Sequence, residues 1–455
     1  MFPEATALAQ IARRDWPDVR LTDTGWRSTS SALRRLAVIT FIAGLFLIPA
    51  AAIAAALLLI NQRAEARRFF NRRFVALIQR LGPAFIKGGQ ILGTRRDILP
   101  RSLCDELSVL QDSVTELTRA QGQSALRAVY GESLEEIFQD INLKPVATGS
   151  IACVYFGRLR NSRQVAIKLQ RPGIRRIILA DVAVMTMIAA ILARLPPLRH
   201  VPINELVEHM CQAIHDQLDF VREAESLGRL RRNLSGVNRI WVPRVETEVS
   251  RNECVVMEFI PGLELTTSQR CSNVVRRKLA ANTLAAVYHM LFVDGFVHCD
   301  LHGGNLYFTE RGHVIILDAG FSVQLSDRMR RLFGEFFLEM ALGRGRRCGE
   351  IVIESATSVN PDARTEQFIS DMAGLVERNS RLAAKDFSLI AFAAEMFDLQ
   401  RKFGINAAPE LLFPLLSLLV IEGTIRDLDP EIDFQQEAKP ILTRGVFDQA
   451  RTSLC

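Results

Sequence analysis

An uncharged run of 25 residues near the N-terminus constrains the fold most, because such a run must be buried or placed in a lipid bilayer. Leu36 to Ile60 contains no Asp, Glu, Lys or Arg. As a helix rising ~1.5 Å per residue it would extend roughly 37 Å, more than a ~30 Å hydrocarbon core requires. A secretory signal peptide has a shorter apolar region. The run predicts a transmembrane helix; the alternatives are a buried core helix and a re-entrant segment broken at Pro49.

Arginines on the two sides of this run predict its orientation. Four lie within 20 residues upstream and six within 20 residues downstream: Arg20, Arg27, Arg34 and Arg35, then Arg63, Arg67, Arg68, Arg72, Arg73 and Arg80. Positive charge gathers on the cytoplasmic side of a membrane. We therefore expect a single-pass protein with its catalytic part in the cytoplasm. The arginine-rich composition favours a bacterial inner membrane over an organelle inner membrane.

The bulk composition excludes some classes of protein. The chain has 455 residues, 49% of them hydrophobic, which suits one large two-lobed domain with extensions and excludes wholesale disorder. The net charge of +6 comes largely from arginines before residue 102, and no basic stripe is interleaved with aromatic residues. We expect no nucleic-acid partner. The sequence does not specify an oligomeric state.

Changes in periodicity divide the chain after the apolar run. Phe70, Phe74 and Ile78 recur at the spacing of one helical face, and helix is expected to continue to residue 142. Short β-branched runs follow, at Ile151–Phe156, Gln164–Leu169 and Asn252–Ile260. The remainder is expected to be helical, with short strands at Asn305–Phe308 and Val314–Leu317. The predicted divisions are an N-terminal segment (1–35), a transmembrane helix (36–60), a helical extension (61–142), a small β-rich lobe (143–262), a larger helical lobe (263–430) and a tail (431–455).

A lysine on a predicted strand provides the first sign of chemistry. Val165–Lys168 reads V-A-I-K, and in kinase-type sites this lysine pairs with the α- and β-phosphates of ATP. Upstream lies a loop of small residues, Ala147, Thr148, Gly149, Ser150, Ile151 and Ala152, whose backbone could approach phosphates closely. Each feature alone is weak, because strand lysines and tight hairpins are common.

The strongest motif is His298–Asn305, which fits H-x-D-x-x-x-x-N. In that motif Asp300 orients or deprotonates the attacking group and Asn305 binds a metal. Asp318 follows the apolar run Val314–Leu317, where an aspartate can chelate magnesium that bridges phosphates. Taken singly, these residues could be a core histidine, a helix cap and a turn residue. Taken together with Lys168, they predict an ATP site.

A third segment completes the expected cleft. Val255–Gly262 fits the hinge between two kinase lobes, where backbone groups near Glu258 and Ile260 would meet the adenine edge. An internal strand ending in a turn fits the same residues. The predicted fold class is α+β: a two-lobed protein-kinase-like fold with an N-terminal helical extension and one transmembrane helix.

Further motifs resemble the UbiB family of atypical kinase-like proteins over about residues 70–430. Lys87-Gly88-Gly89-Gln90 looks like the K-x-G-Q motif of that family, and Thr94–Pro100 is also family-like. Gln217–Ala224 resembles the E-x-D segment with its following helix glutamate, here Glu223. Glu422–Pro430 looks like the C-terminal signature of the family.

The resemblance implies a set of roles. Glu223 would hold Lys168, Asn305 and Asp318 would hold Mg²⁺ beside ATP, and the cleft would be gated by Lys87, Gln90, Gln217 and Asp219. The K-x-G-Q helices would occlude the place where a protein substrate docks. The family is linked to ubiquinone and isoprenoid-lipid metabolism and behaves more as an ATPase than as a peptide kinase. Membrane lipids, isoprenoid-quinone intermediates and a quinone biosynthesis complex are the implied partners.

Two departures from the family pattern suggest a divergent paralogue. Gln217 replaces the first carboxylate of E-x-D, and Ala319 replaces the aromatic residue of D-F-G. These departures leave alternatives to a Mg²⁺-dependent ATPase or kinase open. One is a small-molecule phosphotransferase of the aminoglycoside or choline kinase type, which has a similar H-x-D-x-x-x-x-N motif. Another is a non-catalytic nucleotide-binding scaffold. A true protein kinase is disfavoured because no A-P-E follows Asp318.

Overall fold

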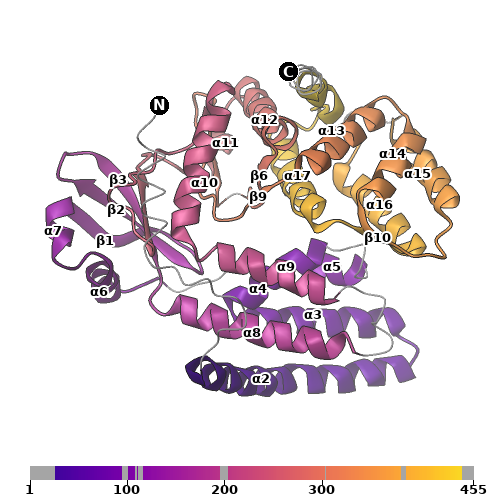
Figure 1. Cartoon of the computed structure of the whole chain (residues 1–455), viewed down its shortest axis with the longest axis horizontal. Coiled ribbons are helices and arrows are strands. Elements are labelled where there is room, and N and C mark those ends of the chain that lie inside the picture. Colours follow the sequence, from indigo (N-terminus) through magenta and orange to yellow (C-terminus); the bar gives the residue numbers. More distant parts are fainter. Residues whose placement is uncertain are drawn as a thin grey trace. The chain divides into compact units, whose positions relative to one another are not determined.

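The computed structural model describes residues 26–94, 101–107, 110, 116–194, 203–302, 304–380 and 386–442, and these form two compact units (Figure 1). The N-terminal unit contains the described residues up to Glu225 together with Val245–Phe259. The C-terminal unit contains Ser226–Arg244 and the described residues from Ile260 onward. The second boundary falls inside the predicted hinge. Most of Thr94–Pro100 and both chain ends lie outside the described residues.

The division into units differs from the predicted small lobe in one place. Residues 226–244 were assigned to that lobe, and the contacts of the chain group them with the C-terminal unit. The reason is strand pairing: β4 (Ile240–Trp241) runs parallel to β8 (Val314–Ile316), which lies in the C-terminal unit. A two-residue strand has no periodicity that a sequence could reveal.

A four-stranded antiparallel sheet forms the centre of the N-terminal unit, in the order β1-β2-β3-β5. Its strands are β1 (Phe138–Thr148), β2 (Ala152–Leu159), β3 (Gln164–Gln170) and β5 (Cys254–Glu258). The last three agree with the predicted runs. Their β-branched and aromatic residues favour the pleated conformation and fill one core with Tyr155, Ile167 and Val256.

The prediction of continuous helix to residue 142 is wrong at its end. Helix α6 (Arg119–Tyr130) begins at a capping box formed by Thr118 and Gln121, and α7 (Leu134–Ile137) is one turn long. Strand β1 then starts at Phe138 rather than after residue 142. The rings of Tyr130 and Phe138 meet edge to face with centroids 5.3 Å apart, so this packing against the sheet core decides the strand.

Three helices of the N-terminal unit run side by side: α2 (Trp26–Leu59), α3 (Arg63–Leu81) and α8 (Ile174–Leu192) (Figure 1). A tight turn at Asn61, which has a φ of 60°, joins α2 and α3. Ile39 of α2 packs with Leu77 and Leu81 of α3 and with Val184 of α8. The predicted helix over the uncharged run is therefore present, is long and apolar enough to cross a membrane, and packs with one of its faces on the rest of the unit.

A buried ion pair fixes α2 in this arrangement. The guanidinium of Arg35 lies 2.5 Å from the carboxylate of Asp181 on α8 and donates a second hydrogen bond of 2.5 Å to the carbonyl of Leu81. The side chain of Asp181 is fully buried. An unpaired buried charge is costly, so the carboxylate requires the arginine.

The remaining helices of the N-terminal unit are α4 (Pro83–Thr94), α5 (Arg101–Leu107), α9 (Ile203–Asp216) and α10 (Phe220–Asn233), which continues into the C-terminal unit. Two glycines allow α4 to pack closely. A Cβ on Gly89 would lie 2.5 Å from Leu110, and one on Gly88 would lie 2.9 Å from Met210. Both glycines of the K-x-G-Q motif are therefore needed for packing.

The described part of the C-terminal unit is mainly helical and contains three small sheets. Strands β4, β8 and β7 (Leu306–Phe308) form one; β6 (Phe296–His298) pairs with β9 (Ser322–Gln324), and β10 (Ala356–Val359) pairs with β11 (Ile405–Ala407). Of these strands, the sequence predicted only β7 and β8; β6, β9, β10 and β11 were wrongly included in helical regions. The principal helices are α12 (Asn273–Tyr288), α13 (Asp327–Ala341), α14 (Gly345–Glu354), α15 (Thr365–Ser380), α16 (Leu389–Phe403) and α17 (Pro409–Leu428).

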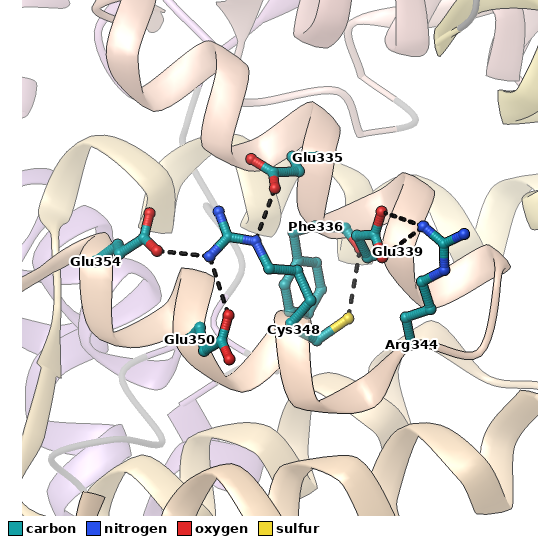
Figure 2. Close-up of polar contacts among 8 residues, drawn as sticks. Glu335, Phe336, Glu339, Arg344, Cys348, Glu350 and Glu354 are labelled. Atoms are coloured by element: carbon teal, nitrogen blue, oxygen red, sulfur yellow. Dashed lines mark hydrogen bonds and ion pairs between the residues drawn. The ribbon is translucent and has the colours of Figure 1, made fainter.

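Charged side chains join α13 to α14 (Figure 2). The guanidinium of Arg347 lies 2.8 Å from Glu335, 2.6 Å from Glu354 and 3.2 Å from Glu350. The thiol of Cys348 donates to the carbonyl of Phe336. The bonds of Arg347 to Glu335 and of Cys348 to Phe336 thus join the two helices.

Candidate nucleotide-binding site

The strand lysine and the helix glutamate form an ion pair. Nζ of Lys168 on β3 lies 2.6 Å from Oε1 of Glu223 on α10, and the glutamate side chain is 2% exposed. The ammonium also lies 5.3 Å from the ring centroid of Phe220. Lys168 pairs with Val154 of β2 and Val255 of β5, so its backbone is fixed on both sides. The structure brings together the two residues that the sequence paired.

The small-residue loop is the tip of the β1–β2 hairpin. Thr148 pairs with Cys153, and the amide of Gly149 donates to the carbonyl of Ala152 over 2.8 Å. Nε of Arg171 donates to the carbonyl of Gly149 over 2.8 Å. Gly149 has no positive φ, and a Cβ there would have only an ordinary van der Waals neighbour at 3.5 Å. Packing within the loop therefore does not require glycine, in contrast to Gly89.

Asp219 has a local structural role. Its Oδ1 accepts a 2.9 Å hydrogen bond from the amide of Arg222, and the amide of Glu223 donates to its carbonyl. Asp219 therefore caps the N-terminus of α10, the helix that carries Glu223. Gln217 is half-buried in the preceding turn. Asp219 thus helps to set where the glutamate helix begins.

The K-x-G-Q residues lie on α4. Nε2 of Gln90 donates to the carbonyl of Leu110 over 3.0 Å, and Lys87 is half-buried. Gln90 therefore ties α4 to the segment that follows α5. The gating role of Lys87 and Gln90 stays a prediction.

The predicted hinge residues lie at the unit boundary. Glu258 ends β5, opposite Val165, and the amide of Phe259 donates to the carbonyl of Gln164. Ile260 is the first residue of the C-terminal unit after the boundary. Gly262 has a φ of +71°, a conformation that favours glycine, and the chain turns there.

In the C-terminal unit, His298 connects the two predicted acidic segments. It is fully buried at the end of β6. Its Nδ1 accepts a 3.1 Å hydrogen bond from the amide of Asp300, so Nε2 carries the proton and donates to the carbonyl of Asp318 over 2.8 Å. Burial lowers the pKa of His298, although the carboxylates of Asp318 and Asp300 oppose this shift. A neutral imidazole thus holds the backbone of both aspartates.

Asn305 closes the loop that begins at Asp300. Its Nδ2 donates to the carbonyl of Asp300 over 2.9 Å and lies 3.3 Å from Nε2 of His302. The amide of Leu317 donates to the carbonyl of Asn305, which joins this loop to the residue before Asp318. The segments that contain Asp300, Asn305 and Asp318, the three residues predicted to act in this unit, are therefore linked by hydrogen bonds.

Asp318 adopts an uncommon backbone conformation. Its φ of 58° lies in the left-handed region, which costs energy for a residue other than glycine. Its Oδ1 accepts a 2.7 Å hydrogen bond from the amide of Gly320. Such strain persists only where the surrounding structure fixes it, and here the hydrogen bond from His298 to the Asp318 carbonyl contributes.

The donor set fits magnesium held by a nucleotide. The bonds of Asn305 to Asp300 and His302 use its Nδ2, and a side-chain amide has a second polar atom, the carbonyl oxygen, that is able to bind a cation. Mg²⁺ is usually held by one or two carboxylates together with substrate phosphates. Within the described ranges, no three His, Cys, Asp or Glu side chains gather as a complete metal cluster. Asn305 and Asp318 therefore suit a magnesium ion whose other ligands come from the nucleotide and water.

Comparison with known proteins places the chain in a family. A family model described as the ABC1 atypical kinase-like domain matches residues 109–352, and one described as the UbiB helical domain matches residues 372–433. The chain is 33% identical over 394 residues to "Probable protein kinase UbiB" of Aeromonas hydrophila subsp. hydrophila, covering 84% of this chain and 72% of that protein. The chain belongs to the UbiB family.

The UbiB family is implicated in ubiquinone biosynthesis and has a kinase-like ATP-binding scaffold. A solved structure with the same fold is Rv3197 of Mycobacterium tuberculosis in complex with erythromycin. It has a TM-score of 0.56 and 19% identity, and the match covers 78% of this chain and 90% of that one. The predictions of family, kinase-like fold and α+β class are confirmed.

The structure assigns a role to residues that sequence reasoning left unexplained. Both carboxylate oxygens of Glu422, in the C-terminal signature, accept hydrogen bonds from the amides of Leu389 and Ile390, at 2.9 and 2.7 Å. Glu422 is 3% exposed and lies 3.8 Å from Arg426. The signature therefore caps the first turn of α16. A glutamate and an arginine at i,i+4 inside an apolar helix were the signal in the sequence.

Proposed function

We propose that this UbiB-family chain is a Mg²⁺-dependent ATPase or kinase-like phosphotransferase that supports ubiquinone or isoprenoid-lipid biosynthesis at a membrane. The buried Lys168–Glu223 ion pair is the observation that carries the proposal. Holding a lysine against a glutamate orients its ammonium toward phosphates in kinase-type sites. The family and its kinase-like scaffold support the same assignment.

Each residue then has a role. Lys168 contacts phosphate oxygens, and Glu223 orients it. Asp300 positions the attacking hydroxyl or water, and its backbone is fixed by His298. Asn305 and Asp318 hold the magnesium ion, which neutralises charge that develops on the phosphates.

The test compares two aspartates in purified full-length protein reconstituted with phospholipid. Asp318→Asn should lower Mg²⁺-dependent phosphate release on the order of 100-fold, because a metal ligand is lost. Asp327→Asn serves as the control, since that side chain is 80% exposed on α13. Equal activity of the two variants would exclude Asp318 from the site.

The same preparation separates the alternatives. Phosphate release that liposomes stimulate, and that Lys87→Ala alters, supports the lipid-linked ATPase. Transfer of phosphate to a soluble metabolite would favour a small-molecule phosphotransferase. Nucleotide binding without turnover would favour a scaffold.

We also propose that α2 attaches the protein to the membrane. The outer face of α2 exposes large apolar side chains at helical spacing, among them Val38, Phe41, Leu45 and Ile48. Only 6% of its most apolar stretch is buried. A surface of this kind suits the interior of a bilayer better than water.

The exposed arginines of α3, which lies beside α2, indicate how α2 attaches to the membrane. Helix α3 lies along α2 and exposes six arginines: Arg63, Arg67, Arg68, Arg72, Arg73 and Arg80. If this hairpin crossed a bilayer intact, those arginines would enter the hydrocarbon at about 2.5–3.5 kcal/mol each near the centre. We therefore propose that α2 lies along the membrane surface, with the arginines near lipid headgroups. The single crossing with a cytoplasmic catalytic part stays a sequence prediction, and it requires α2 to leave α3.

A further inference from the structure

A small apolar cavity lies in the C-terminal unit, apart from the residues of the nucleotide site. It has a volume of about 60 Å³ and is formed by side chains of α13, α14, α16 and α17 and by Ala407 of β11. Its walls are mostly apolar and include Phe333, Phe336, Phe337, Phe392 and Phe397. All five phenylalanines are at least nine-tenths buried.

Two lining residues are polar, Ser355 and Gln400. The hydroxyl of Ser355 donates to the carbonyl of Val352 over 3.0 Å. Gln400 is 2% exposed, and no described residue donates a hydrogen bond to its Oε1. A buried acceptor without a donor is destabilising, so this amide points to a missing partner.

Water is a poor candidate for that partner. A buried water needs two to four polar groups, and a cavity lined by Leu, Ile and Phe stays dry. Here Oε1 of Gln400 is available, but the proton of Ser355 is already donated to Val352. A molecule with one donor group and an otherwise apolar body matches the cavity better.

The walls are held in place from outside. Glu335 and Phe336 are neighbours on α13. Arg347 of α14 donates to Glu335, and Cys348 of α14 donates to the carbonyl of Phe336 (Figure 2 labels Glu335, Phe336 and Cys348). Capping by Glu422 of α17 fixes the N-terminus of α16. Polar contacts thus join α13 to α14 and α16 to α17 beside the cavity, which limits how far these helices shift to fill it.

We propose that this cavity is a binding site for an apolar molecule that carries one hydroxyl group, whose proton is donated to Oε1 of Gln400. The volume admits only part of such a molecule, since a cavity of about 150 Å³ accepts benzene. Met396 also lines the cavity, and its flexible thioether allows some expansion. The site is distinct from the nucleotide site, and its occupancy does not depend on phosphate chemistry.

Photolabelling of the full-length protein in phospholipid nanodiscs tests the proposal. The probes are 3-azibutanol, a four-carbon alcohol with a diazirine, and its methyl ether, which lacks the donor proton. We expect mass spectrometry to find the alcohol on peptides from α13, α14 or α16. The methyl ether should label these peptides about tenfold less, the effect of one hydrogen bond. Labelling of α2 reports membrane partitioning of each probe.

Two variants keep the test decisive. Gln400→Leu should label equally weakly with both probes and should not lower the unfolding temperature, because it removes an unsatisfied amide. Ala393→Phe should block both probes, since Ala393 lines the cavity and is 1% exposed. Equal labelling of the wild type by the alcohol and the ether would overturn the proposal, as would labelling confined to α2.

Discussion

His298 shows how a motif residue can act without touching a substrate. The sequence placed it beside Asp300, and a core histidine was the plain alternative. The structure supports both views, because the residue is fully buried and yet holds the backbone of Asp300 and Asp318. Its role is to position the two aspartates.

The neutral state of His298 predicts a pH effect on stability. Its folded-state pKa lies below the ordinary 6.5. Between those two values the unfolded chain binds more protons, so stability is lost as pH falls below about 6.5, by up to about 1.4 kcal/mol per pH unit. His298→Gln can donate and accept the same bonds without titrating, and it should flatten this dependence. Urea unfolding at pH 7.5 and 5.5 measures the difference.

His302→Gln provides the matched control, because the side chain of His302 is 52% exposed. It should keep the wild-type pH dependence. If His298→Gln lost stability with acid as steeply as the wild type, His298 would not be the titrating group.

At the scale of elements, an apolar or β-branched run decided what the sequence could reveal. Strands β3 and β5 and the helices α2, α3 and α8 contain such runs, and they were predicted. The three-residue strands β7 and β8 were predicted as well, because a motif or an apolar run marked them, whereas β6, β9 and β11, of the same length, were missed. The start of β1 was misplaced because Phe138 pairs with Tyr130 through tertiary packing, which the local pattern does not encode.

In the candidate site, the sequence revealed a contact only where both residues belong to a motif. Lys168 and Glu223 were paired correctly because each belongs to a motif. The contact of Arg35 with Asp181 was not foreseen, because the two residues are 146 positions apart and neither lies in a motif. Such a pair is visible only once the helices have been placed.

The Arg35–Asp181 pair makes a prediction about α2. Arg35→Ala should destabilise the N-terminal unit by about 3–5 kcal/mol, because a fully buried carboxylate loses its partner. The double variant Arg35→Ala/Asp181→Leu should recover much of this loss. Hydrogen exchange of α2 amides gives the readout: exchange should be faster in the single variant and slow again in the double variant. Fast exchange of the α2 amides in both the single and the double variant would contradict this prediction. It would mean that the apolar contacts of Ile39 do not hold α2 without the ion pair.

At the scale of the whole molecule, the residues of the proposed function are distributed over both units of the chain. Lys168 and Glu223 lie in the N-terminal unit, and Asp300, Asn305 and Asp318 lie in the C-terminal unit. The chain passes between the units at Glu225, at Arg244 and at Phe259. The sequence predicted one crossing, at the hinge, because the pairing of β4 with β8 is nonlocal.

The position of the membrane leads to the last prediction. If α2 lies along the surface, the N-terminus and the C-terminal unit are on the same side of the membrane; if it crosses, they are on opposite sides. Epitope tags at both chain ends distinguish these arrangements in a bacterial host. We expect proteinase K to remove neither tag in spheroplasts and both tags in inverted inner-membrane vesicles.

Charge on the outer face of α2 gives an independent check of that arrangement. Phe41→Glu changes a side chain that is 73% exposed, so the fold should survive, while burial of a charge among lipid tails should weaken attachment. Glu132→Lys on the exposed turn after α6 changes charge away from α2 and should leave flotation with liposomes unaltered. A surface-bound helix predicts release of Phe41→Glu from liposomes.

In the tag experiment, digestion of the N-terminal tag alone in spheroplasts would instead establish that α2 crosses the membrane. Helix α2 would then have to separate from α3, which would break the contacts of Arg35 with Asp181 and Leu81.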